Sequence, residues 1–323
     1  MKRIMEIKTS HTRYVGELEK ATRTSQQVSK YLAETSAVLG ELVTDAQYRI
    51  CRKCGFKREG IDPDDWVKRC RKDMQKRPEF YFVTVDTQRN QEQQDRWRRE
   101  AWEAQRRFLR LEQGGFPLRN TKHCTAYGGC AFVGVCAGEF GIEGFATRDD
   151  ANPELSAASG DVDPLTYTMI SSLLDCEEYA RLVYLEGLAK PSSPAQHVGS
   201  AVHFGFEQMD PDAAVEHLNE SRGDELSAEV QEITAMDSGM VRAIVEFGIP
   251  FWPDWPKFRE VEYRLPLVNP ETGATSLRFH LSGVIDGVWT DSLPPIQSSA
   301  DPRSHTDRGV YSVTIDPTKG KEQ

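Results

Sequence analysis

Hydrophobic positions alternate in several short segments of the chain and recur at helical spacing in longer ones. Alternation predicts strands over residues 3–8, 48–58, 81–85, 260–268 and 279–289, of which 48–58 is a strand or a hairpin and the last two pair around a turn at 269–273. Helical spacing predicts helices over residues 25–42, 63–76, 88–113, 168–188, 200–209 and 227–247. The mixture predicts an α/β protein.

Composition divides the chain into parts. Residues 137–165 are rich in Gly, Ala, Ser and Asp with little periodicity, so we expect a linker between residues 1–136 and 166–290. The polar tail, 291–323, is expected to be loop or disordered apart from residues 310–315. No run approaches the length of a membrane span, and no signal-peptide pattern is present at the N-terminus, so we expect a cytoplasmic protein without membrane contact.

Charge is distributed unevenly along the 323 residues. The net charge is −10, but residues 1–150 hold 28 Lys and Arg against 22 Asp and Glu, a balance of +6, and the remainder holds 12 against 28, a balance of −16. A basic half that can follow a phosphate backbone is therefore joined to an acidic half. Solvated charge on helix faces explains any single arginine equally well.

The seven cysteines form two groups and one single residue. An odd count without a secretion signal argues against a disulfide framework. Cys124, Cys130 and Cys136 are evenly spaced in a Gly-rich stretch that indicates a loop held by a ligand, and Cys176 stands alone. The remaining three, Cys51, Cys54 and Cys70, have no fourth partner and are interpreted as incidental.

Two charged motifs lie near opposite ends of the chain. Glu6 and Lys8 project to the same side of the first predicted strand, since side chains alternate along a strand. Asp286 lies in Gly-Val-Ile-Asp-Gly in a second predicted strand. Two carboxylates with a backbone carbonyl, here that of Ile7, and a substrate phosphate suffice to hold Mg²⁺ or Mn²⁺. Such an ion activates water for phosphodiester hydrolysis, and Lys8 can stabilise the developing charge.

Together with Gly199-x-x-x-His203, these motifs resemble the PD-(D/E)xK nuclease superfamily, in its RecB-like iron–sulfur exonuclease branch of the phage and CRISPR-associated type. The resemblance implies a restriction-endonuclease-like core, with a mixed central sheet flanked by helices. It also implies that His203 is a further metal ligand. The implied activity is metal-dependent hydrolysis of DNA, exonucleolytic on single-stranded ends.

Two further features carry the same resemblance. Gln27 and Tyr31, at i and i+4 on one helix face, resemble the Gln-x-x-x-Tyr motif that contacts DNA beside the site in this branch. In its iron–sulfur members one cysteine precedes the His motif and three follow the Gln-x-x-x-Tyr helix. The resemblance therefore implies a [4Fe–4S] cluster, with Zn²⁺ as the alternative occupant, on the following four cysteines: Cys124, Cys130, Cys136 and Cys176.

The order of the motifs differs from that of the branch, which runs His, then Asp, then Glu-x-Lys. Here Glu6 and Lys8 come first, so we interpret the chain as a circular permutation or as the tail of one nuclease joined to the head of another. Residues 315–321 are faintly similar to the third motif in its usual place. Pro317 would remove a hydrogen-bond donor from the ladder of that strand, so we keep Glu6 and Lys8.

The motifs are compatible with three functions. The first is a Mg²⁺- or Mn²⁺-dependent deoxyribonuclease that binds single-stranded DNA, with a second copy or recombination or CRISPR-type proteins as further partners. The second is a non-catalytic DNA-binding or assembly subunit derived from a RecB-like nuclease. The third is a structural protein in which the cysteines hold zinc.

Overall fold

The structure of the protein, a computed structural model, describes residues 2–11, 15–145, 163–188, 193–222, 228–291 and 310–312. Within these residues one sheet contains the strands β1 (Arg3–His11), β2 (Asp45–Lys53), β3 (Phe82–Gln88), β4 (Asp163–Leu165), β5 (Phe258–Val268), β6 (Thr275–Trp289) and β7 (Val310–Ser312). The longer helices are α1 (Val15–Thr22), α2 (Gln26–Leu39), α3 (Pro63–Lys76), α5 (Gln91–Glu112), α8 (Tyr167–Asp175), α10 (Pro194–Gln208), α11 (Pro211–Arg222) and α12 (Ala228–Phe251). Shorter turns are α4 (Pro78–Tyr81), η2 (His123–Gly128), α6 (Val133–Ala137), η3 (Ile142–Gly144), α9 (Glu177–Ala180) and the π-helical η4 (Arg181–Leu185).

The sheet is mixed and draws strands from both halves of the chain. Its strands lie in the order β3-β2-β1-β6-β5-β7, and β4 also pairs with β6. β1 with β2, β4 with β6 and β5 with β7 are parallel pairs, whereas β1 with β6, β2 with β3 and β5 with β6 are antiparallel pairs. The predicted α/β class, with a mixed sheet flanked by helices, is confirmed, and the two predicted halves share this one sheet.

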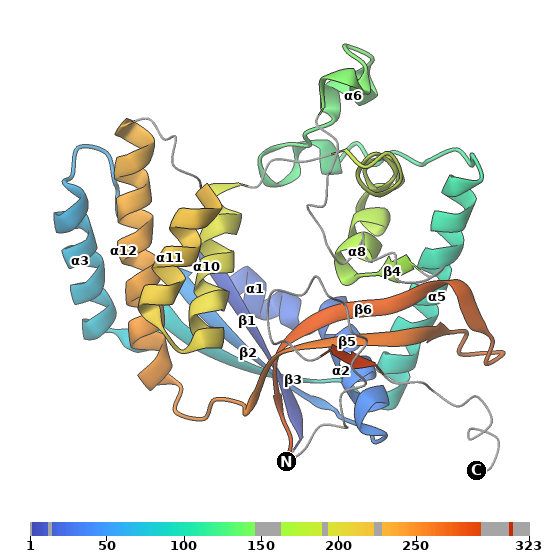
Figure 1. Cartoon of the computed structure of the whole chain (residues 1–323), viewed down its shortest axis with the longest axis horizontal. Helices are drawn as coiled ribbons and strands as arrows, with labels where there is room; N and C mark the ends of the chain where they lie inside the picture. The colour runs from blue at the N-terminus through green and yellow to red at the C-terminus, as the bar shows by residue number, and fades with distance from the viewer. Residues whose placement is uncertain are drawn as a thin grey trace.

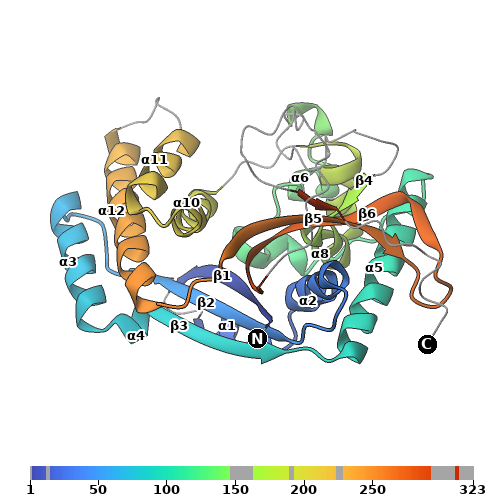
Figure 2. The ribbon, with the colours of Figure 1, turned by 60° about the horizontal axis from the view of Figure 1, so that its bottom comes forward.

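Helices cover both faces of the sheet. In β1, Ile4 packs into a core with α2, α5 and α8, whereas Met5 and Ile7 pack into a second core with α3, α10, α11 and α12. These two groups of helices lie on opposite sides of the molecule in both ribbon views (Figure 1, Figure 2). Because β1 is covered on both faces, its successive side chains are buried. Glu6 is therefore buried between the apolar residues Met5 and Ile7 of the same strand.

Local capping determines where several helices begin and end. α3 begins at Pro63, after the Asp62 side chain, which accepts hydrogen bonds from the amides of Asp64 and Asp65. α5 and α10 begin with capping boxes. α2 ends before the predicted residue 42, because Gly40 adopts the left-handed φ of 67° that terminates helices.

Some predicted boundaries are wrong. The helix predicted over residues 168–188 is broken at Cys176, whose extended backbone separates α8 from α9. Residues 163–165, assigned to the linker, form β4, and residues 146–162 lie outside the described residues. α11 was not predicted, because its buried residues are only Ala214 and Leu218. β7 falls within the predicted segment 310–315; the remainder of the tail after Asp291, including the Pro317 motif, lies outside the described residues.

Among the described helices, none is both long enough and apolar enough to span a bilayer.

Candidate metal centre

β1 and β6 stop pairing next to Asp286, and we call the place where the two strands separate the fork. They pair over Arg3–Met5 with residues 287–289, and the ladder then stops, while β1 continues beside β2 as far as His11. The Asp286 carboxylate enters the fork and accepts a hydrogen bond from the Ile7 amide at 2.5 Å. A side chain thus takes the place of the next strand-to-strand hydrogen bond. Ile7 contributes this amide, and the predicted role of its carbonyl as a metal ligand stays a prediction.

Glu6 and Lys8 lie beside this fork, on the same side of β1. Lys8 forms an ion pair with Glu6, whose side chain is 2% exposed. Gln27, in the first turn of α2, donates to Glu6 Oε1 at 2.8 Å and to the Tyr31 hydroxyl at 3.0 Å. The predicted Gln-x-x-x-Tyr face therefore orients the Glu6 carboxylate.

Tyr31 differs from the expectation in one respect. Its ring is 8% exposed and packs into the core beneath α2, so it offers no open face on which a nucleotide could stack. The motif contacts Glu6 through Gln27 instead. A role in positioning the carboxylate fits this geometry better than the predicted contact with DNA.

His203 reaches the fork from the other helical layer. α10 carries it so that Nδ1 lies 3.6 Å from Asp286 Oδ1. Gly199, one turn earlier, lies against β1: a Cβ at this position would be 3.3 Å from Thr9 Oγ1. The glycine of Gly-x-x-x-His thus permits the close approach of α10 to the strand that carries Glu6 and Lys8.

Glu260 lies with His203 and Asp286 and was missed from the sequence, whereas the Glu6 carboxylate is not a member of this group of three. Ligand atoms of His203, Glu260 and Asp286 all lie within 4.8 Å of one another. Glu260 has a φ of 47°, which is rare for a residue other than glycine, although Arg259 and Val261 on either side of it pair with Gly287 and Ile285 in one continuous register. Such strain is concentrated at functional sites.

The reason for the omission is a register shift in the hairpin. Near the turn, Val268 pairs with Thr275, and counting from that pair would place Gly283 opposite Glu260. The irregularity between Pro266 and Val268 moves the register, so that Glu260 instead falls opposite Asp286. Nothing in the alternation of apolar residues signals this shift.

The charges in the fork perturb one another. Burial and the nearby Asp286 raise the pKa of Glu6 to about 7, against the opposing effects of Lys8 and His203. Burial lowers the pKa of His203, but Asp286 and Glu260 outweigh it and raise the value to about 9. Burial raises the pKa of Asp286, but His203, Lys8 and the Ile7 amide together lower it below its usual range. These coupled carboxylates are the kind of group that a divalent cation stabilises.

One orphaned atom supports a cation at this position. Glu6 Oε2 is buried and has no hydrogen-bond partner among the described residues. Buried carboxylate oxygens without a donor are rare in folded proteins, because their desolvation is not compensated. Carboxylate oxygens with one imidazole nitrogen form a donor set suited to Mg²⁺ or Mn²⁺.

We expect Glu260→Gln to lower the affinity of the purified protein for Mn²⁺ by on the order of tenfold, because the isosteric amide removes one anionic oxygen from the group around Asp286. Titration of Mn²⁺ followed by electron paramagnetic resonance measures this change. Glu271→Gln, in the exposed hairpin turn, is the control and should leave the affinity unchanged. Equal affinities in the two variants would exclude Glu260 from the ligand set.

The four predicted cluster cysteines line one pocket of about 220 Å³. Cys124 lies in η2 and Cys130 follows it, Cys136 lies in α6, which stands away from the sheet in Figure 1, and Cys176 lies at the break between α8 and α9. Hydrogen bonds from Glu178 N to Leu118 O and from Asn120 Nδ2 to Asp175 O hold the two chain segments together. The break at Cys176 thus turns its side chain toward the other three cysteines.

The remaining cysteines occupy a different environment. Cys51, Cys54 and Cys70 are buried in the core between the sheet and α3. Burial raises the pKa of the Cys51 thiol above its usual range, which disfavours the thiolate needed to bind a metal. This placement fits their interpretation as incidental.

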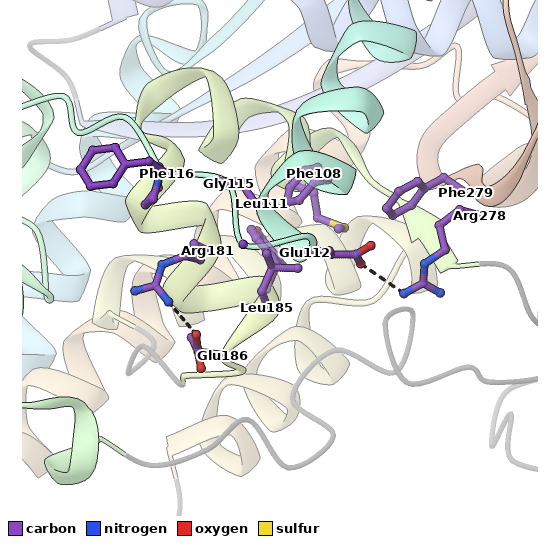
Figure 3. Close-up of a pocket in the computed structure, with 14 residues that line it drawn as sticks. Phe108, Leu111, Glu112, Gly115, Phe116, Arg181, Leu185, Glu186, Arg278 and Phe279 are labelled. Atoms are coloured by element: carbon purple, nitrogen blue, oxygen red, sulfur yellow. Dashed lines mark hydrogen bonds and ion pairs between the residues drawn. The ribbon is translucent and has the colours of Figure 1, made fainter.

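A further cavity lies away from both the fork and the cysteines. It measures about 810 Å³ and lies between the end of α5, η4 and the start of β6. Its arginines are paired: Arg181 points toward Glu186 and Arg278 toward Glu112 (Figure 3). None of the residues predicted for the metal centre lines it.

Comparison of the chain with protein-family models, with curated proteins and with solved structures finds no match.

Proposed function

We propose that the protein is a Mg²⁺- or Mn²⁺-dependent deoxyribonuclease with a PD-(D/E)xK core that acts on single-stranded DNA ends. One observation carries the proposal: segments about 280 residues apart place Glu6, Lys8 and Asp286 in one fork of the sheet, and α10 adds His203. A chance Glu-x-Lys would have no reason to lie beside a buried aspartate, with one oxygen of its own glutamate buried without a hydrogen-bond partner among the described residues.

Each residue has a chemical task in this proposal. Asp286, His203 and Glu260, whose ligand atoms lie within 4.8 Å of one another, would hold the metal ion, which supplies Lewis acidity and lowers the pKa of water when bound. Glu6 lies outside that group and would add its unpartnered oxygen from the neighbouring strand. Lys8 places its ammonium beside Glu6, where it can stabilise negative charge that develops on the phosphate. Gln27 restrains Glu6 through its amide, so the carboxylate does not reorganise during the reaction.

We further propose that the cysteine pocket holds a [4Fe–4S] cluster rather than zinc. The four cysteines line one pocket and so supply the four thiolates that such a cluster needs. The resemblance to the iron–sulfur members of the RecB-like branch, in which one cysteine precedes the His motif and three follow the Gln-x-x-x-Tyr helix, supports the cluster over zinc. Iron and zinc analysis of anaerobically prepared protein distinguishes the two occupants.

We expect end-labelled single-stranded DNA to be shortened in the presence of Mg²⁺ or Mn²⁺ and to stay intact in EDTA. The measurement compares 5′- and 3′-labelled strands, with a closed circular single strand as the control that an exonuclease cannot enter. Cleavage of the circle at the same rate would contradict action at ends. If protein with its cysteine site loaded cleaves no DNA substrate, the non-catalytic DNA-binding function takes its place.

A further inference from the structure

α2 buries a lysine and a glutamate behind the fork. Lys30 and Glu34 are each 1% exposed, and their Nζ and Oε1 atoms lie 3.8 Å apart. Tyr263 of β5, also 1% exposed, faces the ammonium, with its ring centroid 5.3 Å from Nζ. Burying an ion pair costs desolvation, and apolar residues of similar volume often stabilise a fold equally well. The pair therefore calls for a role other than stability.

Lys30 makes a hydrogen bond to the backbone of β6. Its Nζ donates to the Ser282 carbonyl at 2.7 Å. β6 pairs with β4 over residues 279–281 and with β1 over residues 287–289. Between these two pairings, over residues 282–286, β6 pairs with neither β4 nor β1 among the described residues, and Ser282 is the first residue of this interval. The lysine thus anchors β6 at the start of the interval that contains Asp286.

Gly283 makes this contact possible. A Cβ at Gly283 would be 2.4 Å from the Tyr263 hydroxyl and 3.0 Å from Lys30 Nζ. Any larger residue would displace one of the two side chains from β6. The first glycine of Gly-Val-Ile-Asp-Gly therefore leaves room for the lysine side chain. This explains why a glycine occupies the position, independently of the Asp286 carboxylate.

Glu34 completes the arrangement. Both of its carboxylate oxygens are buried without a conventional hydrogen-bond partner among the described residues, and the ammonium of Lys30 forms an ion pair with it. Burial raises the pKa of Glu34 to about 7, although Lys30, Tyr263 and Arg98 oppose this effect. Glu34 thus provides the counter-charge for the buried ammonium of Lys30, which the Ser282 carbonyl holds in place.

We propose that Lys30 and Glu34 are positioning residues of the metal centre: they fix β6 at Ser282, so that Asp286, four residues later, enters the fork and meets the Ile7 amide and His203. This inference rests on the proposed function. Lys30 and Glu34 would not be ligands: they would touch neither the metal ion nor DNA, and would act through the position of Asp286. Their effect is expected on metal affinity as well as on the rate of cleavage.

The test is the double variant Lys30→Met/Glu34→Leu, which removes both charges and so leaves neither buried without its partner. We expect the variant to fold and to bind Mn²⁺ roughly 10- to 100-fold more weakly than the wild type, the range found for residues that orient metal ligands. The matched control is Arg71→Met/Glu246→Leu, which removes an ion pair between α3 and α12 that contacts none of the residues in the fork. It should bind Mn²⁺ with unchanged affinity.

Glu34→Gln provides a second variant, because it preserves volume and should fold even if the double variant does not. We expect a smaller loss of Mn²⁺ affinity, since Lys30 keeps its bond to Ser282 but loses its counter-charge. Wild-type Mn²⁺ affinity in Glu34→Gln, or in a folded double variant, would overturn the inference. A wild-type protein that binds Mn²⁺ but cleaves no DNA would instead overturn the proposed function, and the Mn²⁺ titrations would still decide the positioning role. If the wild type binds no Mn²⁺, both fail.

Discussion

Glu6→Ala and Asp286→Ala should each reduce metal-dependent cleavage of single-stranded DNA by on the order of 10³-fold or more, while DNA binding changes little. The carboxylates would hold the ion that activates water, and a loss of several kcal/mol of transition-state stabilisation corresponds to a rate loss of this size. Affinity for DNA comes mainly from contacts between basic residues and phosphates, which these changes leave in place. Removing a negative charge from the site would if anything strengthen binding.

Single-turnover cleavage at saturating Mg²⁺, alongside a binding titration at fixed salt, measures the two effects separately. Asp86→Ala is the matched control, because Asp86 is an exposed carboxylate of the same sheet on the outer strand β3. It should cleave at the wild-type rate. A comparable loss of rate in Asp86→Ala would show that the effect is a general one on the sheet, and wild-type rates in Glu6→Ala would remove Glu6 from the proposed site.

Cys176→Ser should lose most of the iron of anaerobically prepared protein and lower its Tm. Four-thiolate ligation contributes folding free energy as well as chemistry, and binding of a structural metal is worth about 10 kcal/mol or more in small zinc domains. A cluster on the four cysteines would join the segment after α8 to the segment that carries α6, so loss of Cys176 would remove a link between parts of the chain about 40 to 50 residues apart. Iron content per protein and thermal unfolding measure the two losses.

Cys54→Ala provides the control, because Cys54 is buried in the core near Tyr81 and does not line the cysteine pocket. It should lower the Tm through lost packing but retain the iron. Iron content unchanged in Cys176→Ser would contradict the assignment of this residue. Stoichiometric zinc without iron in the wild-type protein would favour the zinc alternative.

Local patterns in the sequence were enough to predict several elements of this fold. α3 coincides with the predicted residues 63–76, because a proline after an N-cap aspartate marks the start of a helix in the chain itself. Strand alternation also correctly placed Glu6 and Lys8 on one side of β1, and helical spacing placed Gln27 beside Tyr31. These features depend on residues within one or two turns of one another, which is the range over which a sequence pattern carries information.

Tertiary structure alone decided how these pieces meet. The irregular register between β5 and β6 brings Glu260 opposite Asp286, and the interval of β6 between its pairings with β4 and β1 gives Lys30 a backbone carbonyl to bind. The break at Cys176 depends on hydrogen bonds to residues near 118–120, far from it in the chain. Such features arise from contacts between distant segments, whose free energy exceeds the local preferences of each. The sequence by itself therefore determined most elements and most of the candidate residues, whereas the packing around the fork added Glu260, Lys30 and Glu34 and determined which residues lie together.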